Sequence, residues 1–195
     1  MLHFNYSAKP VLFTFPPRIA LAFVVVALVS SACSKDGSAD LPAGMVTRND
    51  FENVQGWGGA NELSVTVEKA RSGKSSICVN PQVEFSYTYN RQLSQMTGGK
   101  PKKLTVTGWA WVPDKDAKAL IVVDIKRSAE KGTQVFYEGL ELATAVKDFK
   151  EWSEVKKTFI LPDSISSVNQ CKVYMWRGSS PRPVYLDDVS ISLEN

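Results

Sequence analysis

Few side chains in this sequence are suited to catalysis. The only histidine, His3, lies in the first 32 residues, which have the features of a segment removed on export. Without histidine, the rest of the chain has no Ser-His-Asp or Cys-His arrangement and no histidine-ligated metal. Carboxylate, lysine and tyrosine chemistry are the catalytic options that remain.

A group of acidic residues in the second half of the chain is the main source of carboxylates for such chemistry. Two paired carboxylates are the arrangement that hydrolyses glycosidic bonds. The acidic residues are Glu138, Glu141, Asp148, Glu151 and Glu154. They stand among Lys147, Lys150, Lys156 and Lys157. Acids interspersed with lysines are typical of a solvated face, so we expect no enzymatic activity.

Aromatic and polar side chains alternate with aliphatic ones along the middle of the chain. In residues 103–112, Trp109 and Trp111 share one face and small aliphatic side chains share the other. The same period-two alternation assigns further polar and aromatic residues to the face opposite the aliphatics: Asp124, Gln134, Glu138, Tyr174 and Trp176. One face of a sheet is therefore expected to be aliphatic and buried, and the other aromatic and polar.

Two cysteines lie in predicted strands, and their pairing is open. Cys171 is in phase with apolar Val173 and Met175, whereas Cys78 alternates with its apolar neighbours. An oxidising compartment permits a disulfide between Cys78 and Cys171, but spacing alone does not fix pairing. A disulfide and two lone thiols are equally compatible with the sequence.

Nine short segments with period-two patterning position these side chains. They are Leu63–Lys69, Ser75–Asn80, Val83–Asn90, Lys103–Val112, Ala119–Arg127, Thr133–Leu142, Trp152–Leu161, Cys171–Trp176 and Val184–Leu193. Turns rich in Gly, Pro, Asp and Lys separate them, which predicts an antiparallel all-β sandwich or barrel. Helix is expected only briefly, at Leu93–Met96 or Ala143–Lys147.

The first 32 residues predict a signal peptide. They contain Lys9 and Arg18 but no acidic residue, followed by an eleven-residue apolar run from Ile19 to Val29 and then small residues. That run is shorter than the ~20 residues needed to span a bilayer. Ser31-Ala32-Cys33 resembles the lipobox of bacterial lipoproteins, which implies a lipid on Cys33. Ser30 departs from that motif, and ordinary cleavage at a small-x-small site is the alternative.

The mature chain is expected to be one tethered domain of nearly neutral charge. Residues 33–46 are small, polar and Gly/Pro-rich, which predicts a lipid-anchored flexible tether, and residues 47–195 would form the domain. Without Lys9 and Arg18, 21 basic residues face 20 acidic ones, a net charge of +1. This balance gives no electrostatic reason to expect nucleic-acid binding. The expected location is the cell envelope, as an outer-membrane lipoprotein of a Gram-negative bacterium.

Short motifs in a fixed order carry a family resemblance across residues 49–193. They are Asn49-Asp50-Phe51-Glu52, Gly56-Trp57, Ser72-Gly73-Lys74-Ser75-Ser76, Trp109-Ala110-Trp111-Val112, Glu151-Trp152-Ser153-Glu154-Val155 and Tyr185-Leu186-Asp187-Asp188-Val189-Ser190-Ile191. This order resembles the carbohydrate-binding modules of bacterial cellulases and xylanases, in the galactose-binding-like jelly-roll superfamily. The resemblance implies an antiparallel jelly-roll β-sandwich that binds sugar on a concave sheet face or at a loop edge.

The resemblance also implies one structural calcium ion near the joined termini. Its candidate ligands here are Glu52, Asp187 and Asp188. Asp187 is in strand phase with apolar residues, and a buried carboxylate needs compensation, for which Ca²⁺ is suited. An arginine or lysine partner, or backbone N–H donors at a strand end, would compensate it equally well.

For sugar, the resemblance implies aromatic platforms with polar companions, because pyranose rings combine apolar C–H faces with hydroxyl groups. The candidate contacts are Trp109, Trp111, Asp124, Gln134, Glu138, Tyr174, Trp176 and Arg177. Packing is the alternative role for Trp109 and Trp111. The predicted function is therefore non-catalytic glycan binding by an envelope-anchored lipoprotein domain. The alternative is a structural or protein-interaction module of a cell-envelope complex, with an envelope protein as partner.

Overall fold

A computed structural model describes residues 41–53, 56–59, 62–127 and 132–195, all within the unit Ser38–Asn195. The expected signal peptide, Cys33 and most of the expected tether lie outside the described residues. The strands are β1 (Met45–Asn49), β2 (Trp57–Gly58), β3 (Val65–Thr66), β4 (Ser76–Val79), β5 (Thr88–Gln92), β6 (Lys103–Trp111), β7 (Leu120–Lys126), β8 (Gln134–Glu141), β9 (Trp152–Ile160), β10 (Gln170–Trp176) and β11 (Val184–Glu194). Three short helical turns join them: η1 (Glu62–Ser64), α1 (Leu93–Met96) and α2 (Leu142–Ala145).

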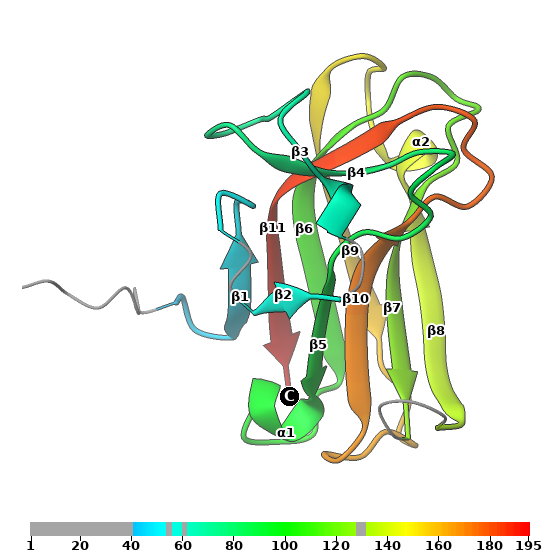
Figure 1. The fold of residues 1–195 in the computed structure, drawn as a ribbon. Coiled ribbons are helices and arrows are strands. Elements are labelled where there is room, and N and C mark those ends of the chain that lie inside the picture. Colours follow the sequence, from blue (N-terminus) through cyan, green and yellow to red (C-terminus); the bar gives the residue numbers. More distant parts are fainter. Residues whose placement is uncertain (1–40, 54–55, 60–61, 128–131) are drawn as a thin grey trace, which may run out of the picture. The chain divides into compact units, whose positions relative to one another are not determined.

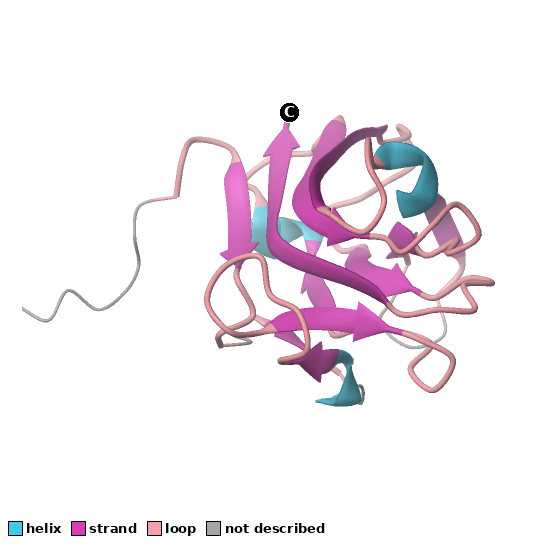
Figure 2. Ribbon diagram, turned by 90° about the horizontal axis from the view of Figure 1, so that it is seen from above, coloured by secondary structure: helices cyan, strands magenta, loops and turns pink. Residues whose placement is uncertain are grey.

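The strands form two antiparallel sheets. The six-stranded sheet has the order β3-β4-β11-β6-β9, with β1 also paired to β11, and the five-stranded sheet has the order β2-β5-β10-β7-β8. Figure 1 shows β10, β7 and β8 in front of β6 and β9, and Figure 2 shows how little of the described chain is helical. Neighbours in both sheets are distant in sequence, as in a sandwich whose chain crosses repeatedly between layers. The expected all-β sandwich is confirmed.

Period-two alternation explains the core between the sheets. In β6 the side chains of Leu104, Val106 and Ala110 are fully or almost fully buried, while Thr107 and Trp109 between them stay partly exposed. Phe159 of the six-stranded sheet meets Phe136 of the five-stranded sheet edge-to-face, with ring centroids 6.4 Å apart. Burial of these aliphatic and aromatic side chains is the main force that joins the layers.

The structure differs from the expected elements at several places. The predicted strand Leu63–Lys69 is a strand only at Val65–Thr66, after the turn η1. β1 begins at Met45, two residues before the expected domain start, because it pairs with β11. The predicted strand Val83–Asn90 is mostly irregular before Thr88, with isolated bridges Asn80–Val83 and Phe85–Trp176. Helix forms at both expected positions, each as a single turn. Within the described part of the chain, no helix is long and apolar enough to cross a bilayer.

Both cysteines in the described part are free and buried. Cys78 pairs with Tyr185 in the six-stranded sheet, whereas Cys171 lies in the five-stranded sheet. Burial raises the pKa of Cys78 to about 11 and that of Cys171 to about 12. Of the two possibilities left open by the sequence, the structure has two lone thiols that are protonated at neutral pH.

Candidate functional site

The outer face of the five-stranded sheet carries a row of polar side chains that crosses four strands. Strand register puts Lys172 of β10 directly opposite Asn90 of β5 on one side and Asp124 of β7 on the other. Asp124 is in turn opposite Tyr137 of β8. Because side chains at paired positions point the same way, these four residues share the face that is turned away from the core.

Asp124 is the most constrained member of this row. Its side chain is only 6% exposed, and Lys126 Nζ lies 3.2 Å from Oδ2. The other oxygen, Oδ1, is buried and has no hydrogen-bond partner among the described residues. A buried acceptor without a donor is uncommon in native proteins, and an absent partner such as a ligand is one explanation.

Aromatic side chains border Asp124 on the same outer face. Tyr174 and Trp176 follow Lys172 along β10, and Phe85 contacts Tyr174 edge-to-face at 5.8 Å between ring centroids. Burial raises the pKa of Tyr174, and the nearby Tyr137 hydroxyl and Asp124 carboxylate raise it further. Tyr174 is therefore a neutral hydroxyl donor beside a carboxylate. Phe85 and Tyr137 remain about two-fifths exposed.

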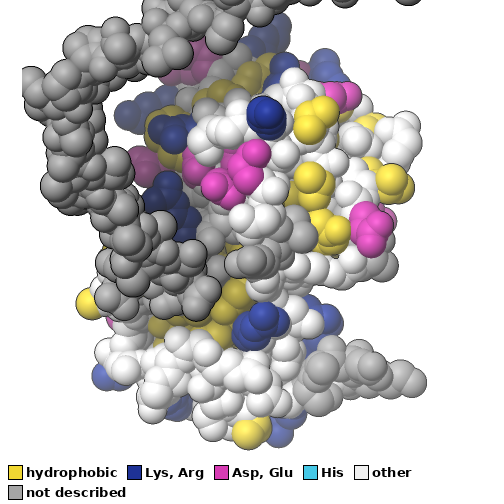
Figure 3. Space-filling view, turned by 60° about the vertical axis from the view of Figure 1, so that its left-hand side comes forward, with side chains coloured by type: hydrophobic (Ala, Val, Ile, Leu, Met, Phe, Trp, Pro, Cys, Tyr) yellow, Lys and Arg dark blue, Asp and Glu magenta, His cyan; other side chains and the backbone are white. Residues whose placement is uncertain are grey.

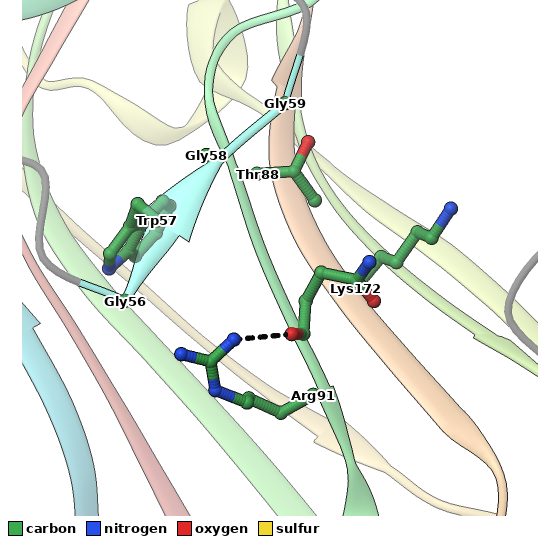
Figure 4. Close-up of a pocket in the computed structure, with 8 residues that line it drawn as sticks. Gly56, Trp57, Gly58, Gly59, Thr88, Arg91 and Lys172 are labelled. Atoms are coloured by element: carbon green, nitrogen blue, oxygen red, sulfur yellow. Dashed lines mark hydrogen bonds between the residues drawn. The ribbon is translucent and has the colours of Figure 1, made fainter.

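A hollow of about 430 Å³ lies at the β2 end of this face. Gly58 and Gly59 border it, and a Cβ added to either would meet nothing within 4 Å, so the missing side chains leave the space open. Figure 4 shows Thr88 near Gly58, with the Arg91 guanidinium on the Trp57 side of β5 and Lys172 extending to the other side. Arg91 is held by the carbonyl of its neighbour Asn90 at 3.0 Å.

The structure brings together Asp124, Gln134, Tyr174 and Trp176 of the predicted sugar contacts. Gln134 is exposed and opposite Lys126, two pairs along from Asp124 and Tyr137. The Trp176 indole N–H donates to Glu84 Oε1 at 3.3 Å. Arg177 follows at the end of β10, and its guanidinium donates to the Ser180 carbonyl at 3.3 Å.

Glu138 does not lie on this face, which corrects the prediction from alternation. A β-bulge between Ile125 and Lys126 of the β7–β8 pair shifts the register, so that Tyr137 rather than Glu138 faces outward with Gln134. One extra residue in a strand reverses the face of every residue after it. Glu138 instead forms an ion pair of 2.7 Å with Lys157 of the other sheet.

Trp109 and Trp111 also lie apart from the other predicted contacts, on the outer face of the six-stranded sheet. As predicted, they alternate along β6 with aliphatic side chains that face the core. Cations cover them, however, with the Arg71 guanidinium 4.2 Å from the Trp109 centroid and Lys69 Nζ 4.4 Å from that of Trp111. One face of each ring is therefore in contact with the segment at residues 69–72, and Trp109 also borders a hollow of about 270 Å³ on this outer face.

The three carboxylates expected to hold calcium have donors from the protein itself. Asp187 Oδ2 accepts backbone N–H bonds from Arg71 (2.8 Å) and Ser72 (3.2 Å), and Oδ1 accepts from Asp188 N (2.7 Å). The Asp188 carboxylate accepts from the Ser72 hydroxyl at 2.9 Å and from the Arg71 guanidinium at 3.2 Å. Glu52 accepts the N–H groups of Lys74 and Ser75, which lower its pKa.

The residues as arranged do not fit a calcium ion. In the described part of the chain, no three histidine, cysteine or acidic side chains are grouped closely enough to hold a metal. Asp187 is fully buried because the 69–72 segment covers it on the outer face, not because it points into the core. The buried charge of Asp187 is compensated by backbone N–H donors, one of the alternatives to calcium given above. Its neighbour Asp188 is bound by an arginine.

Several residues of the outer face were not predicted from the sequence. Tyr137, Lys172, Asn90 and Phe85 lie beside the predicted residues but carry no motif. Tyr137 was missed because the bulge reverses the face on which it lies, and Phe85 was missed because the segment before β5 is irregular. For Lys172 a signal existed, since it alternates with Cys171 and Val173 in the predicted strand.

Solved structures of similar fold include carbohydrate-binding modules. The CBM22-1 xylan-binding domain from Paenibacillus barcinonensis Xyn10C aligns with a TM-score of 0.50 at 18% identity, over 76% of this chain and 94% of that domain. The C-terminal family 22 carbohydrate binding module of Clostridium thermocellum Xyn10B aligns with a TM-score of 0.52 at 14% identity, over 77% and 93%. This chain has the jelly-roll fold of these modules.

The jelly-roll expectation is thus confirmed at the level of fold. By sequence, no family model matches the chain and no curated protein is significantly similar to it. The likeness to the jelly-roll modules therefore rests on the order and pairing of the strands.

Proposed function

We propose that the outer face of the five-stranded sheet binds a carbohydrate chain without cleaving it. The solved domains of the same fold named above include a xylan-binding domain and a carbohydrate-binding module. The described face combines exposed aromatic rings with amide, carboxylate and ammonium groups. Such surfaces suit sugars, which present apolar C–H faces and a rim of hydroxyls.

The unpartnered oxygen of Asp124 is the observation that carries this proposal. A buried acceptor left without a donor costs about 1–3 kcal/mol. A sugar hydroxyl that donates to Oδ1 would remove this cost on binding, and hydrogen bonds to an ionised acceptor are stronger than neutral ones. Tyr137 is opposite Asp124 in the register, and Tyr174 lies two residues along β10 from Lys172, the residue opposite Asp124 on its other side. Both tyrosines would contact the ring of the same sugar.

Affinity electrophoresis in gels that contain soluble polysaccharides tests the proposal. The unmodified protein should be retarded by at least one of xylan, mixed-linkage glucan, mannan or pectin, and Tyr174→Ala should abolish the retardation. Trp109→Ala is the matched control, because it removes an aromatic side chain from the other sheet, and it should leave the retardation unchanged. If Trp109→Ala lost the retardation and Tyr174→Ala kept it, binding would lie on the six-stranded sheet and the proposal would be wrong. No retardation by any glycan would also refute the proposal.

We further propose that this domain acts at the cell envelope, anchored by a lipid on Cys33. The sequence before residue 47 supports this proposal, through the basic start, the short apolar run and the lipobox-like Ser31-Ala32-Cys33. On the face drawn in Figure 3, visible basic side chains lie singly or in small groups among acidic ones. Such interspersed charge suits binding to a polymer of sugars better than to a nucleic acid.

A protein partner in the envelope is the second candidate function. Leu63 is 83% exposed and Val67 is 78% exposed, on either side of β3 at one edge of the six-stranded sheet. Exposed apolar side chains that lie close together mark protein interfaces when they form a patch. Co-purification of one stoichiometric protein with the unmodified chain, lost in Leu63→Ser with Val67→Ser, would support this function.

A further inference from the structure

A row of apolar side chains crosses the outer face of the five-stranded sheet, beside the polar row that contains Asp124. Strand register puts Trp176 of β10 between Phe85, which precedes β5, and Leu120 of β7. Phe85 is 40% exposed, and Trp176 and Leu120 are partly exposed. β10 and β7 lie side by side in Figure 1, and this apolar row crosses them at the end where β7 begins. The outer face is therefore apolar at this end and polar at Asp124.

The Leu120 side chain is fixed in the apolar row by two glycines. A Cβ on Gly139 of β8 would lie 2.8 Å from Leu120 Cδ2, and a Cβ on Gly178 would lie 3.0 Å from Leu120 Cδ1. The two methyl groups of Leu120 therefore occupy the space where side chains at these positions would lie. Val122, the next residue on this face of β7, is apolar and fully buried. Along β7, no polar side chain separates Leu120 from Asp124.

Two carboxylates flank the apolar row. Glu141 of β8 is opposite Leu120 in the register, and Glu84 accepts the Trp176 indole N–H at 3.3 Å. Arg177, the next residue after Trp176, donates its guanidinium N–H to a backbone carbonyl at 3.3 Å. Carboxylates repel a negatively charged ligand group but not a neutral one. The row therefore suits a neutral, apolar part of a ligand.

A bare sugar hydroxyl finds few partners in this row. Its three side chains carry one hydrogen-bonding group, the Trp176 indole N–H, and this group is bonded to Glu84. We propose that the row binds the methyl group of an O-acetyl ester, so that the ligand is an acetylated polysaccharide. Acetylation replaces a hydroxyl with a neutral group that ends in a methyl, and burial of a methyl against apolar side chains is favourable. This inference rests on the proposed function, because it names the substrate class of the same face.

The spacing of the two rows explains how one sugar would reach both. Tyr174 lies two residues from Trp176 and two from Lys172 along β10, which is about 7 Å in each direction. A sugar ring that packs on Tyr174 and donates a hydroxyl to Asp124 has its opposite edge turned to the apolar row. An acetyl group on that edge would contact Leu120 and Trp176.

Matched polysaccharides test the inference. Acetylated xylan and acetylated glucomannan are each compared with the same polymer after mild alkali, which removes the esters and keeps the backbone. We expect at least one acetylated form to bind at least about fourfold more tightly than its deacetylated form, as measured by affinity electrophoresis. Leu120→Thr should remove most of this preference and keep the binding of the deacetylated form. Leu120→Ile, which retains the apolar surface, should keep the preference.

Ile160→Thr is the control, since it removes an aliphatic side chain that is 65% exposed on the outer face of the other sheet. It should keep the full preference, and a loss equal to that in Leu120→Thr would overturn the assignment to the apolar row. Nuclear Overhauser effects between acetyl and Leu120 methyl protons test the same contact in the unmodified protein. Their absence from a complex with an acetylated oligosaccharide would also overturn the assignment.

The polysaccharide comparison separates this inference from the proposed function. Equal or weaker binding of the acetylated forms, with the deacetylated forms bound, would overturn the inference and leave the proposed function intact. Binding only of polysaccharides that carry no acetyl groups would do the same. No binding to any polysaccharide would refute both.

Discussion

At Asp124, one carboxylate oxygen is paired and the other is not, and this asymmetry is the basis of the binding role that we propose for it. Oδ2 has Lys126 at 3.2 Å, while Oδ1 is buried without a donor among the described residues. In contrast, Asp187 has backbone donors on both oxygens. The acceptors of Asp187 are used within the fold, whereas Asp124 keeps one acceptor that a ligand could use.

Asp124→Asn should therefore separate binding from stability. We expect the affinity for the bound polysaccharide to fall at least about tenfold, because the amide is a weaker acceptor than the carboxylate. The melting midpoint should stay the same or rise, because a buried charge is replaced by a neutral group and Lys126 can remain solvated. Calorimetric titration and thermal melting measure the two effects.

Asp163→Asn is the control for that variant, since Asp163 is a fully exposed carboxylate paired with Lys100. It should change neither quantity. If Asp124→Asn instead bound sugar as well as the unmodified protein, the unpartnered oxygen would have no part in recognition.

The two buried thiols give a second prediction at the residue scale. Because burial raises the pKa of Cys78 to about 11 and that of Cys171 to about 12, fewer than about one thiol in a hundred is a thiolate at pH 8. Iodoacetamide should label neither cysteine in the folded protein and both in 6 M guanidinium, as counted by mass spectrometry. Absence of labelling in denaturant without reductant would reveal a disulfide and contradict the structure.

At the scale of elements, strand alternation was predictable and its interruptions were not. The aliphatic core sides of β6 and β7, and with them the sandwich, followed from period-two patterning. Bulges at Ile125/Lys126 and at Asp187/Ser190 broke the pattern. They turned Glu138 inward and put Asp187 on the outer face, since one added residue reverses all later side chains. Nothing in the residue types at these points signals the extra residue.

The second bulge, between Asp187 and Ser190, shapes the turn in which the sequence predicted a calcium site. Asp188 adopts a φ of 48°, in the left-handed region, and the 69–72 segment folds over Asp187. Nearby, Gly73 has a φ of 59°, and a Cβ there would lie 2.5 Å from the Glu52 carboxyl group. The acidic residues of the opening and closing motifs thus anchor neighbouring turns through backbone N–H groups.

Asp187→Ala should destabilise the fold by at least about 2 kcal/mol at pH 7, because it leaves three N–H groups without an acceptor. Burial raises the pKa of Asp187 above its unfolded value of about 3.9, so the folded protein binds the proton more tightly. Its contribution to stability is then largest below pH ~4 and is lost as the pH rises through the raised pKa. The gap in unfolding free energy between the unmodified protein and Asp187→Ala should widen as the pH falls from 7 to 4.

Denaturant titrations at several pH values measure this gap, with Ser190→Ala as the control for a mutation near the same bulge. A gap that narrows on acidification would contradict the sign of the pKa shift. EDTA should leave the melting midpoint unchanged. A midpoint that rises on addition of Ca²⁺ would instead support a calcium site at these carboxylates.

At the scale of the whole molecule, the two outer faces of the sandwich differ in availability. On the six-stranded face, Arg71 and Lys69 lie over the tryptophan rings, whereas on the five-stranded face Tyr137 and Phe85 are about two-fifths exposed and Lys172 and Thr88 line the larger of the two hollows described. The motif that suggested sugar binding thus lies on the covered face. The proposed recognition surface lies on β7, β8 and β10, which contribute no motif.

The anchor belongs to the same scale, because it decides where that face is presented. Cys33→Ser should move the protein from the detergent phase to the aqueous phase in Triton X-114 partitioning after expression in a Gram-negative host. The reason is that acyl chains on Cys33 would supply the membrane affinity. An unmodified protein that already partitions into the aqueous phase, with no acyl mass on residue 33, would contradict lipidation.

The most direct test of the binding face is a map of amide chemical shifts on addition of an oligosaccharide from the tightest-binding polysaccharide. We predict the largest changes at Asp124, Tyr137, Lys172 and Tyr174, in β7, β8 and β10, with no change at Trp109 and Trp111. Changes centred on the 69–72 segment and the two tryptophans would contradict the account.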